Sequence, residues 1–145
     1  MYKRQTLSLS GSGGASDDSF TPAQSITLSS STPASNTALT FGDYAVANFG
    51  STRFATDITI ANWSTTAYND FALNSSGLTN ISKTGVSKFG TRVSADFTNT
   101  APDAGASKRA AVAAFLAETV GTSSDPKLAV THSVGSSSAF FLLFD

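Results

Sequence analysis

Short stretches in which apolar and polar residues alternate recur along this chain, and they constrain its fold more than any other feature. Alternation with a period of two places the apolar side chains on one face of an extended strand. The cleanest alternation runs from Val86 to Phe97. Other stretches of this kind contain Leu7 and Leu9, Ile26 and Leu28, Phe54 to Ile60, Phe71 and Leu73, and Leu128 and Val130. The chain is therefore predicted to consist mainly of strands.

The composition favours the same fold class. Polar character comes from hydroxyl groups, with 24 Ser and 19 Thr among 145 residues, whereas only 13% of the residues are charged. Threonine is favoured in strands, and serine with glycine is favoured in turns. We therefore expect an all-β, antiparallel β-sandwich that is jelly-roll-like. One short helix is expected near residues 75–82, capped by Asn74. A single helical turn is expected at Thr40–Tyr44, packed down by Phe41, Tyr44, Val46 and Phe49.

The last third of the chain contains one ambiguous and one clear segment. The Ala-rich run from Lys108 to Glu118 has high helix propensity, which is a weak guide because tertiary packing overrides it. The dipeptide Asp125-Pro126 disfavours helix and begins an extended segment. Leu128 and Val130 then alternate with polar or small residues. Residues 118–132 are therefore predicted to form a strand end, a polar loop and a closing strand.

Charge and cysteine content argue against several classes of function. The formal net charge is −1, so the chain has no electrostatic footprint for nucleic acid. It has no cysteine, which removes disulfides, thiol catalysis and cysteine-based zinc sites. No apolar run approaches the roughly 18 residues of a membrane-spanning helix. We expect no cofactor, although the pair Asp17 and Asp18 leaves a structural calcium ion open.

The two ends of the chain differ from the rest. Met1-Tyr2-Lys3-Arg4-Gln5 matches the translation of a transposon-end adapter used in sequencing libraries. This predicts that residues 1–5 are an artefact, that the sequence is a metagenomic fragment cut at its 5′ end, and that N-terminal strands are missing. A genuine basic N-terminus is the alternative. A single β-sandwich domain is expected over residues 6–132. Residues 133–145 are predicted to be a linker followed by the apolar tail Ala139–Phe144, which is a final strand, an edge for a partner chain or an aggregation hazard.

Several of these features occur together in one known family. The relevant features are Trp63, Tyr68–Leu73, the short helix, the long strand, Glu118 and the closing sequence Pro126-Lys127-Leu128-Ala129-Val130-Thr131. This pattern resembles the DNRLRE family of β-sandwich domains, which are related to carbohydrate-binding modules. A similar arrangement occurs in surface and tail proteins of uncultured phages. The resemblance covers about residues 63–132 and implies a strand, not a helix, before Glu118. The Ala-rich strand and the absent first strands depart from the family pattern.

A polysaccharide-binding site would need an aromatic platform, because aromatic faces stack on the C–H surface of pyranose rings. The candidates for this platform are Trp63, Tyr68 and Tyr44. The polar residues that could orient sugar hydroxyls are Asn62, Asn69, Asp70 and Arg92. The alternative is that Trp63 packs in the core or at a corner of the sandwich. Burial of all three aromatic residues would remove the support that the sequence gives to sugar binding.

No pattern of residues predicts catalysis. His132 is the only histidine, and no nucleophile elbow accompanies it. A glycosidase needs two placed carboxylates, and the spacing of Glu118 from Asp96 or Asp125 does not support such a pair. Glu118 is predicted to point inward and to accept hydrogen bonds from the following loop, since a buried carboxylate must be satisfied.

These observations predict a non-enzymatic module. The first hypothesis is polysaccharide binding or adhesion on a secreted or virion-surface protein. The second is a purely structural domain of a phage tail or surface fibre, in which Ala139–Phe144 contacts other virion or surface-protein chains. Both hypotheses place the protein outside the cell or on a virion. A hydrolase is the least favoured alternative.

Overall fold

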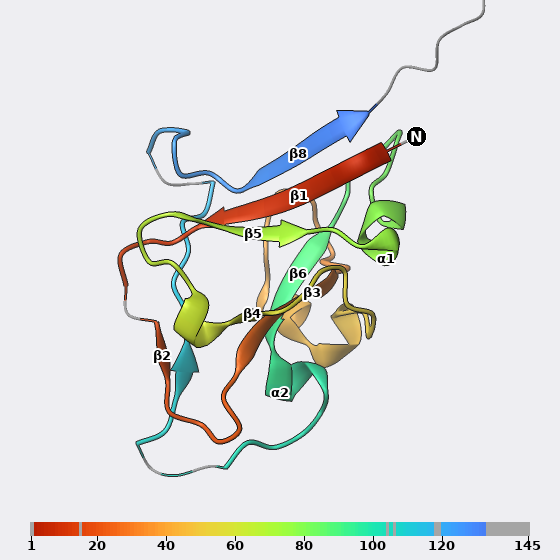
Figure 1. Cartoon of the computed structure of the whole chain (residues 1–145). Coiled ribbons are helices and arrows are strands. Elements are labelled where there is room, and N and C mark those ends of the chain that lie inside the picture. Colours follow the sequence, from red (N-terminus) through yellow and green to blue (C-terminus); the bar gives the residue numbers. More distant parts are fainter. Residues whose placement is uncertain (1, 15, 104, 106, 118–119, 133–145) are drawn as a thin grey trace, which may run out of the picture.

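The fold is carried by antiparallel strands in the computed structural model, which describes residues 2–14, 16–103, 105, 107–117 and 120–132 (Figure 1). The strands are β1 Tyr2–Ser10, β2 Asp17–Asp18, β3 Ser25–Ser30, β4 Ile58–Thr59, β5 Tyr68–Ala72, β6 Phe89–Val93, β7 Ala110–Ala111 and β8 Lys127–His132. The helical elements are α1 Ser75–Thr79, α2 Ser94–Phe97 and the 3-10 turns η1 Phe41–Tyr44, η2 Val46–Asn48 and η3 Ile60–Asn62. The prediction of an all-β fold is confirmed.

The strand pairing is nested. One sheet has the order β5-β1-β8, a second β4-β3-β6, and a third contains β2 and β7. Thus β1 pairs with β8, β2 with β7, and β3 with β6. A long antiparallel ribbon that is rolled up gives this nesting, which is typical of a jelly roll. The fold nevertheless differs from a full jelly roll, which has two sheets. Besides the nested pairs, β5 pairs with β1 and β4 pairs with β3.

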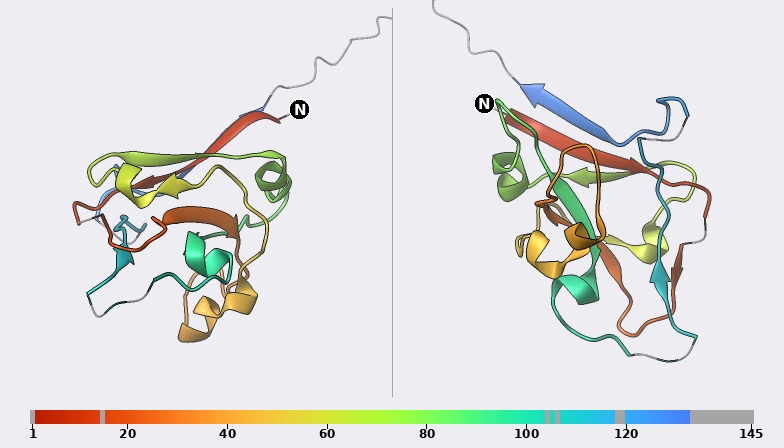
Figure 2. Two further views of the ribbon diagram at one scale, coloured as in Figure 1. Left: turned by 60° about the horizontal axis from the view of Figure 1, so that its bottom comes forward. Right: turned by 180° about the vertical axis from the view of Figure 1, so that it is seen from behind.

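The core lies between the two three-stranded sheets. In the left view of Figure 2, β5 and β1 form a layer above β3. Phe71 from β5 and Leu28 from β3 are fully buried between these layers, and the rings of Phe54 and Phe89 meet edge to face at 6.1 Å. The remaining members of this core are Ile26, Ala55, Ile60, Trp63, Leu73 and Ile81. Burial of these apolar side chains is the main favourable term in the stability of the fold.

The strand β3 is buried on both of its faces. Ile26 and Leu28 point into the core as the alternation predicts, but Thr27 and Ser29 on the other face are also fully buried. The Thr27 hydroxyl donates a hydrogen bond of 2.9 Å to Asp57 from the segment before β4. The polar face of this strand is therefore satisfied by protein groups, as buried polar atoms require.

The predicted long strand at residues 86–97 is wrong at both ends. Strand β6 covers only Phe89–Val93, and the chain then turns into α2. The side chain of Gln24 explains this turn, because its Oε1 accepts hydrogen bonds from the Ala95 N–H at 2.9 Å and the Ser94 hydroxyl at 3.0 Å. Gln24 thus supplies the acceptor that the start of a helix needs, and no local alternation can reveal it.

The structure also describes the expected helix near residues 75–82 and most of the Ala-rich run at 108–118. The helix after Asn74 is confirmed, since Asn74 Oδ1 accepts a hydrogen bond from the Gly77 N–H at 3.0 Å, and α1 ends at Thr79. In the Ala-rich run, the described residues form β7 and a bridge between Gly11 and Ala114, and none of them is helical. Glu118, with its predicted inward role, lies outside the described residues.

The first and last strands of the chain, β1 and β8, both bear on predictions from the sequence. Strand β8 confirms the predicted closing strand, and Leu128 lies opposite Leu7 of β1. Residues 2–5 belong to β1, so β1 begins before Thr6, the expected start of the domain. Whether an adapter encodes them stays a prediction.

Candidate functional site

Two of the three predicted platform residues do not offer a free ring. Trp63 is only 4% exposed, and its indole Nε1 donates to the Ala113 carbonyl at 3.3 Å, so its prediction as a sugar platform is wrong. Tyr68 is half-buried, and its hydroxyl lies 2.7 Å from the Ser123 carbonyl and 3.0 Å from the Asp125 carbonyl. The Lys127 ammonium lies 4.0 Å from the centre of the Tyr68 ring. Trp63 therefore serves the core, and Tyr68 holds the loop before β8.

Of the four polar residues predicted to contact a sugar, two are used within the fold and two are exposed. Asn69 is buried, accepts from the Ser64 N–H at 2.7 Å and donates to the Ser64 and Leu9 carbonyls. The Arg92 side chain is only 7% exposed and is paired with Asp96 at 2.6 Å. Both predictions as ligand contacts are corrected, because these groups are already used inside the fold. Asn62 and Asp70 are exposed, and their role stays a prediction.

Tyr44 is the predicted platform residue that faces solvent. It lies in the segment of residues 34–49, called here the 34–49 loop, which contains η1 and η2. Tyr44 is 67% exposed and Phe41 is 96% exposed, and Leu39 and Val46 are exposed as well. The expectation that Phe41, Tyr44 and Val46 pack the turn down is therefore wrong. Of the four residues named for that packing, only Phe49 is partly buried.

The buried residue of this turn is a carboxylate. Asp43 accepts hydrogen bonds from the Ala34 N–H at 2.8 Å, the Thr40 N–H at 2.7 Å and the Thr40 hydroxyl at 3.0 Å. The two backbone N–H groups are the main cause that lowers the pKa of Asp43, and the Thr40 hydroxyl and the charge of Lys88 act in the same direction. Asp43 thus stays ionised and closes the loop on itself.

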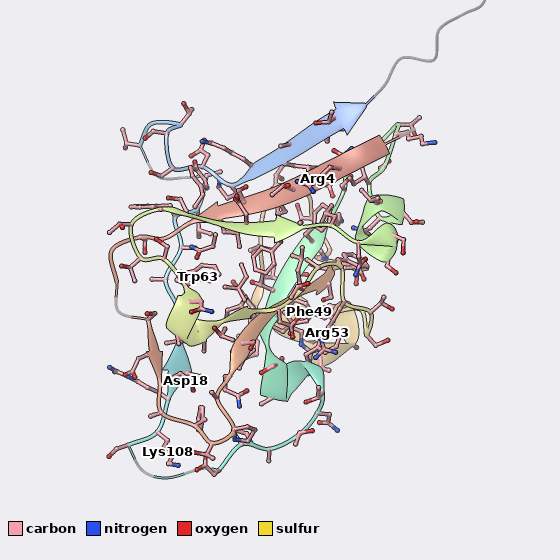
Figure 3. The ribbon with its side chains drawn as sticks, viewed as in Figure 1. Arg4, Asp18, Phe49, Arg53, Trp63 and Lys108 are labelled. Atoms are coloured by element: carbon pink, nitrogen blue, oxygen red, sulfur yellow. The ribbon has the colours of Figure 1, made fainter. Side chains whose placement is uncertain are left out.

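Further contacts fix the loop to the β4-β3-β6 sheet. The Asn48 carbonyl accepts from the Thr32 N–H at 2.9 Å, and the Lys88 ammonium donates to the Pro33 carbonyl at 3.0 Å. The ring of Phe49 lies against Gly90 of β6, where a Cβ atom would come within 2.6 Å of the ring. Figure 3 shows Phe49 in this region, and Arg92 lies over its ring at 5.5 Å.

The 34–49 loop therefore combines a fixed backbone with exposed apolar groups. In both views of Figure 2 its gold turns lie beside α2 and away from β8. A surface that is already ordered loses little conformational entropy when a ligand binds. Aromatic groups add large contact area with few rotatable bonds. This arrangement suits recognition.

Replacement of Asp43 by asparagine is expected to loosen the 34–49 loop, because an amide cannot accept at both of the carboxylate positions. Acid should have the same effect. The pKa of Asp43 is lower in the folded chain than in the unfolded chain, so its stabilising contribution is present above about pH 4 and is lost as the pH falls through the lowered pKa. The amide NMR signals of Ala34 and Thr40 report this loss. Acid-induced changes at these amides that persist in Asp43→Asn would contradict the assignment.

A second candidate surface is an open hollow beside α2. Its volume is about 460 Å³, and a smaller hollow of about 220 Å³ adjoins it. Its lining is mostly apolar and comprises Phe20, Val93, Ala95, Asp96, Asn99, Thr100, Ala101, Pro102 and Ala110. The carboxylate of Asp96 is held by Arg92, which lowers the pKa of Asp96. Asn99 and Thr100 supply the other polar side chains of its lining.

The neighbouring carboxylates Asp17 and Asp18, the candidates for a calcium ion, are bound by other groups of the fold. Within the described ranges, no three His, Cys, Asp or Glu side chains lie close enough together to hold a metal ion. The Asp17 carboxylate pairs with Arg109, and Asp18 accepts from the backbone N–H groups of Phe20 and Gln24. The prediction of a structural calcium ion thus stays open, and His132 is described only through the pairing of its backbone with Tyr2.

The part of the chain that the structure describes contains no helix of the length and hydropathy needed to span a membrane. One polar atom near the closing strand is unpaired: Oδ1 of Asp125 is buried without a hydrogen-bond partner among the described residues.

Comparisons with protein-family models, with curated proteins and with solved structures found no match to this chain. The resemblance to DNRLRE domains therefore stays a prediction.

Proposed function

We propose that this domain is a non-catalytic module that binds polysaccharide through the 34–49 loop, on a secreted or virion-surface protein. The observation that carries the proposal is the exposure of Tyr44 and Phe41 on a loop whose backbone is held by the buried Asp43. Exposed apolar groups stabilise a fold little, so their presence on an ordered loop favours an intermolecular role.

The chemistry of the loop fits a sugar polymer. The rings of Tyr44 and Phe41 offer apolar faces for the C–H surface of pyranose rings. The same loop carries the exposed polar residues Asn36 and Thr37, which can exchange hydrogen bonds with sugar hydroxyls. The low content of charged residues, 13%, fits a neutral ligand better than a charged one. The resemblance to carbohydrate-binding modules, given above for residues 63–132, points to the same class of ligand.

A purely structural role in a phage tail or surface fibre is the second candidate. The observation that favours it is the exposure of Leu128 and Val130 on the edge strand β8. In this case the domain would contact protein chains, and the 34–49 loop would bind no sugar.

Tyr44→Ala and Phe41→Ala are each expected to weaken polysaccharide binding about tenfold, which corresponds to ~1.4 kcal/mol. A glycan array with the full chain identifies the ligand, and affinity electrophoresis in gels containing that polysaccharide then measures the loss. Val86→Ala is the matched control, because Val86 is also an exposed apolar residue but lies outside the loop. All three variants should unfold within about 0.5 kcal/mol of the parent chain. Retention of the full chain by no polysaccharide, or equal retention of Tyr44→Ala, would refute the proposal.

A further inference from the structure

The strand β8 lies at the edge of the β5-β1-β8 sheet. It pairs with β1 on one side, and no strand among the described residues pairs with its other side. In Figure 1 it lies at the margin of the fold. Two of its large apolar side chains are accessible to solvent, with Leu128 37% and Val130 45% exposed. Edge strands of this kind are usually short, charged or covered, because their free backbone groups pair readily with another strand.

The side chains of Leu128 and Val130 lie on the core face of the sheet. Leu128 lies opposite Leu7, and Leu7 lies opposite the fully buried Phe71. Val130 lies opposite Gln5, which is also fully buried. Residues that are opposite each other in an antiparallel pair point to the same face. The apolar face of the core therefore continues onto β8, where it reaches solvent.

The chain that follows β8 has the composition of a covering strand. Six residues with the sequence Ser-Val-Gly-Ser-Ser-Ser connect His132 to the segment Ala-Phe-Phe-Leu-Leu-Phe at 139–144. Phenylalanine is favoured in strands, and Gly135 with the serines suits a turn. Connections of a few residues are the common way to join two antiparallel strands.

We propose that Ala139–Phe144 of the same chain pairs with the free edge of β8 as an antiparallel strand. A connection of six residues places Ala139 opposite His132. Phe141 then lies opposite Val130, and Leu143 lies opposite Leu128. In this register the row of Phe71, Leu7 and Leu128 gains Leu143, so the added strand extends the apolar face. Phe140 and Leu142 lie on the other face of the sheet.

The same chain is the occupant that the connectivity favours. A segment joined to β8 by only six residues is present at an effective concentration in the millimolar range. A second copy at micromolar concentration competes poorly with such a segment. This inference rests on β8 and the sequence after it, and it is independent of sugar binding at the 34–49 loop.

Cysteine pairs test the register directly, because the chain contains no native cysteine. The double variant Val130→Cys with Phe141→Cys places two thiols on the same face at the spacing of a cross-strand pair, which a disulfide can bridge. The matched control is Val130→Cys with Leu142→Cys, whose thiols lie on opposite faces. On mild oxidation of the full chain, the first pair is expected to form a disulfide within one chain at least tenfold faster than the control. Equal rates, a faster control or disulfides mainly between chains would overturn the proposal.

Amide hydrogen exchange provides a second test that needs no oxidation. The full chain is compared with a chain that ends at Ser138, and both are expected to be monomeric by sedimentation. Loss of the tail should speed exchange in β8 at least tenfold and leave exchange in β3 unchanged. Unchanged exchange in β8, or protection that depends on protein concentration, would overturn the pairing within one chain.

Discussion

Replacing Trp63 with alanine is expected to destabilise the domain by about 3–5 kcal/mol, which is a large part of the 5–15 kcal/mol typical of a folded domain. The indole is 4% exposed, packs in the core between the sheets and donates a hydrogen bond to the Ala113 carbonyl. Its removal leaves a cavity and an unpaired acceptor. Urea unfolding followed by far-ultraviolet circular dichroism measures the loss, because Trp63 is the only tryptophan and fluorescence would lose its reporter.

Trp63→Phe is the matched variant for this prediction. It keeps an aromatic ring in the core but removes the indole N–H, so we expect a cost of roughly 1–3 kcal/mol. A sugar platform would give the opposite pattern, with a stable Trp63→Ala chain that no longer binds. That pattern would contradict the buried position of Trp63.

Gln5→Met is expected to cost roughly 1–3 kcal/mol, although the two side chains have similar volume. Gln5 is fully buried, and its side-chain amide bonds the backbone of Thr131 twice, by donation to the carbonyl at 2.9 Å and acceptance from the N–H at 3.0 Å. These two hydrogen bonds lie beside the point, between Tyr2 and Arg4, at which the pairing register of β1 with β8 shifts. A thioether can replace neither bond, so the end of β8 should also exchange its amide hydrogens faster.

Arg4→Met is the matched control for Gln5→Met. Arg4 is the preceding residue of β1, and it is exposed. Its replacement should change the free energy of unfolding by less than about 0.5 kcal/mol. Denaturant unfolding of the two variants separates the cases. Equal stability of both variants would contradict the buried, hydrogen-bonded position of Gln5.

Alternation located the strands well because it reports the burial of one face, which is a local property of a strand. It therefore found β3, β5 and β8. It failed where a distant group decides the backbone. The end of β6 depends on Gln24, which lies 71 residues before Ala95. The position of Trp63 depends on Ala113, which lies 50 residues after it.

The candidate site was found only in part for a related reason. The sequence indicated a helical turn at residues 40–44 packed down by its aromatic residues, as hydrophobic residues usually are, although Tyr44 was also a candidate for the sugar platform. In the structure the burial of these side chains is the reverse: Asp43 is buried, and Phe41 and Tyr44 are exposed. The spacing Thr40-x-x-Asp43 is a capping signal that could have revealed the buried carboxylate. Nothing in the sequence indicates that the turn lies outside the core.

The central claim is that the 34–49 loop is the ligand-binding surface, and an NMR titration of the full chain tests it most directly. The ligand is the polysaccharide that the glycan array identifies, added as short oligosaccharides to the chain labelled with nitrogen-15. We predict that the amide signals that shift belong to residues 34–49 and that Tyr44→Ala abolishes these shifts. Shifts confined to the hollow around Phe20 and Asn99, or no shifts at saturating ligand, would contradict the claim.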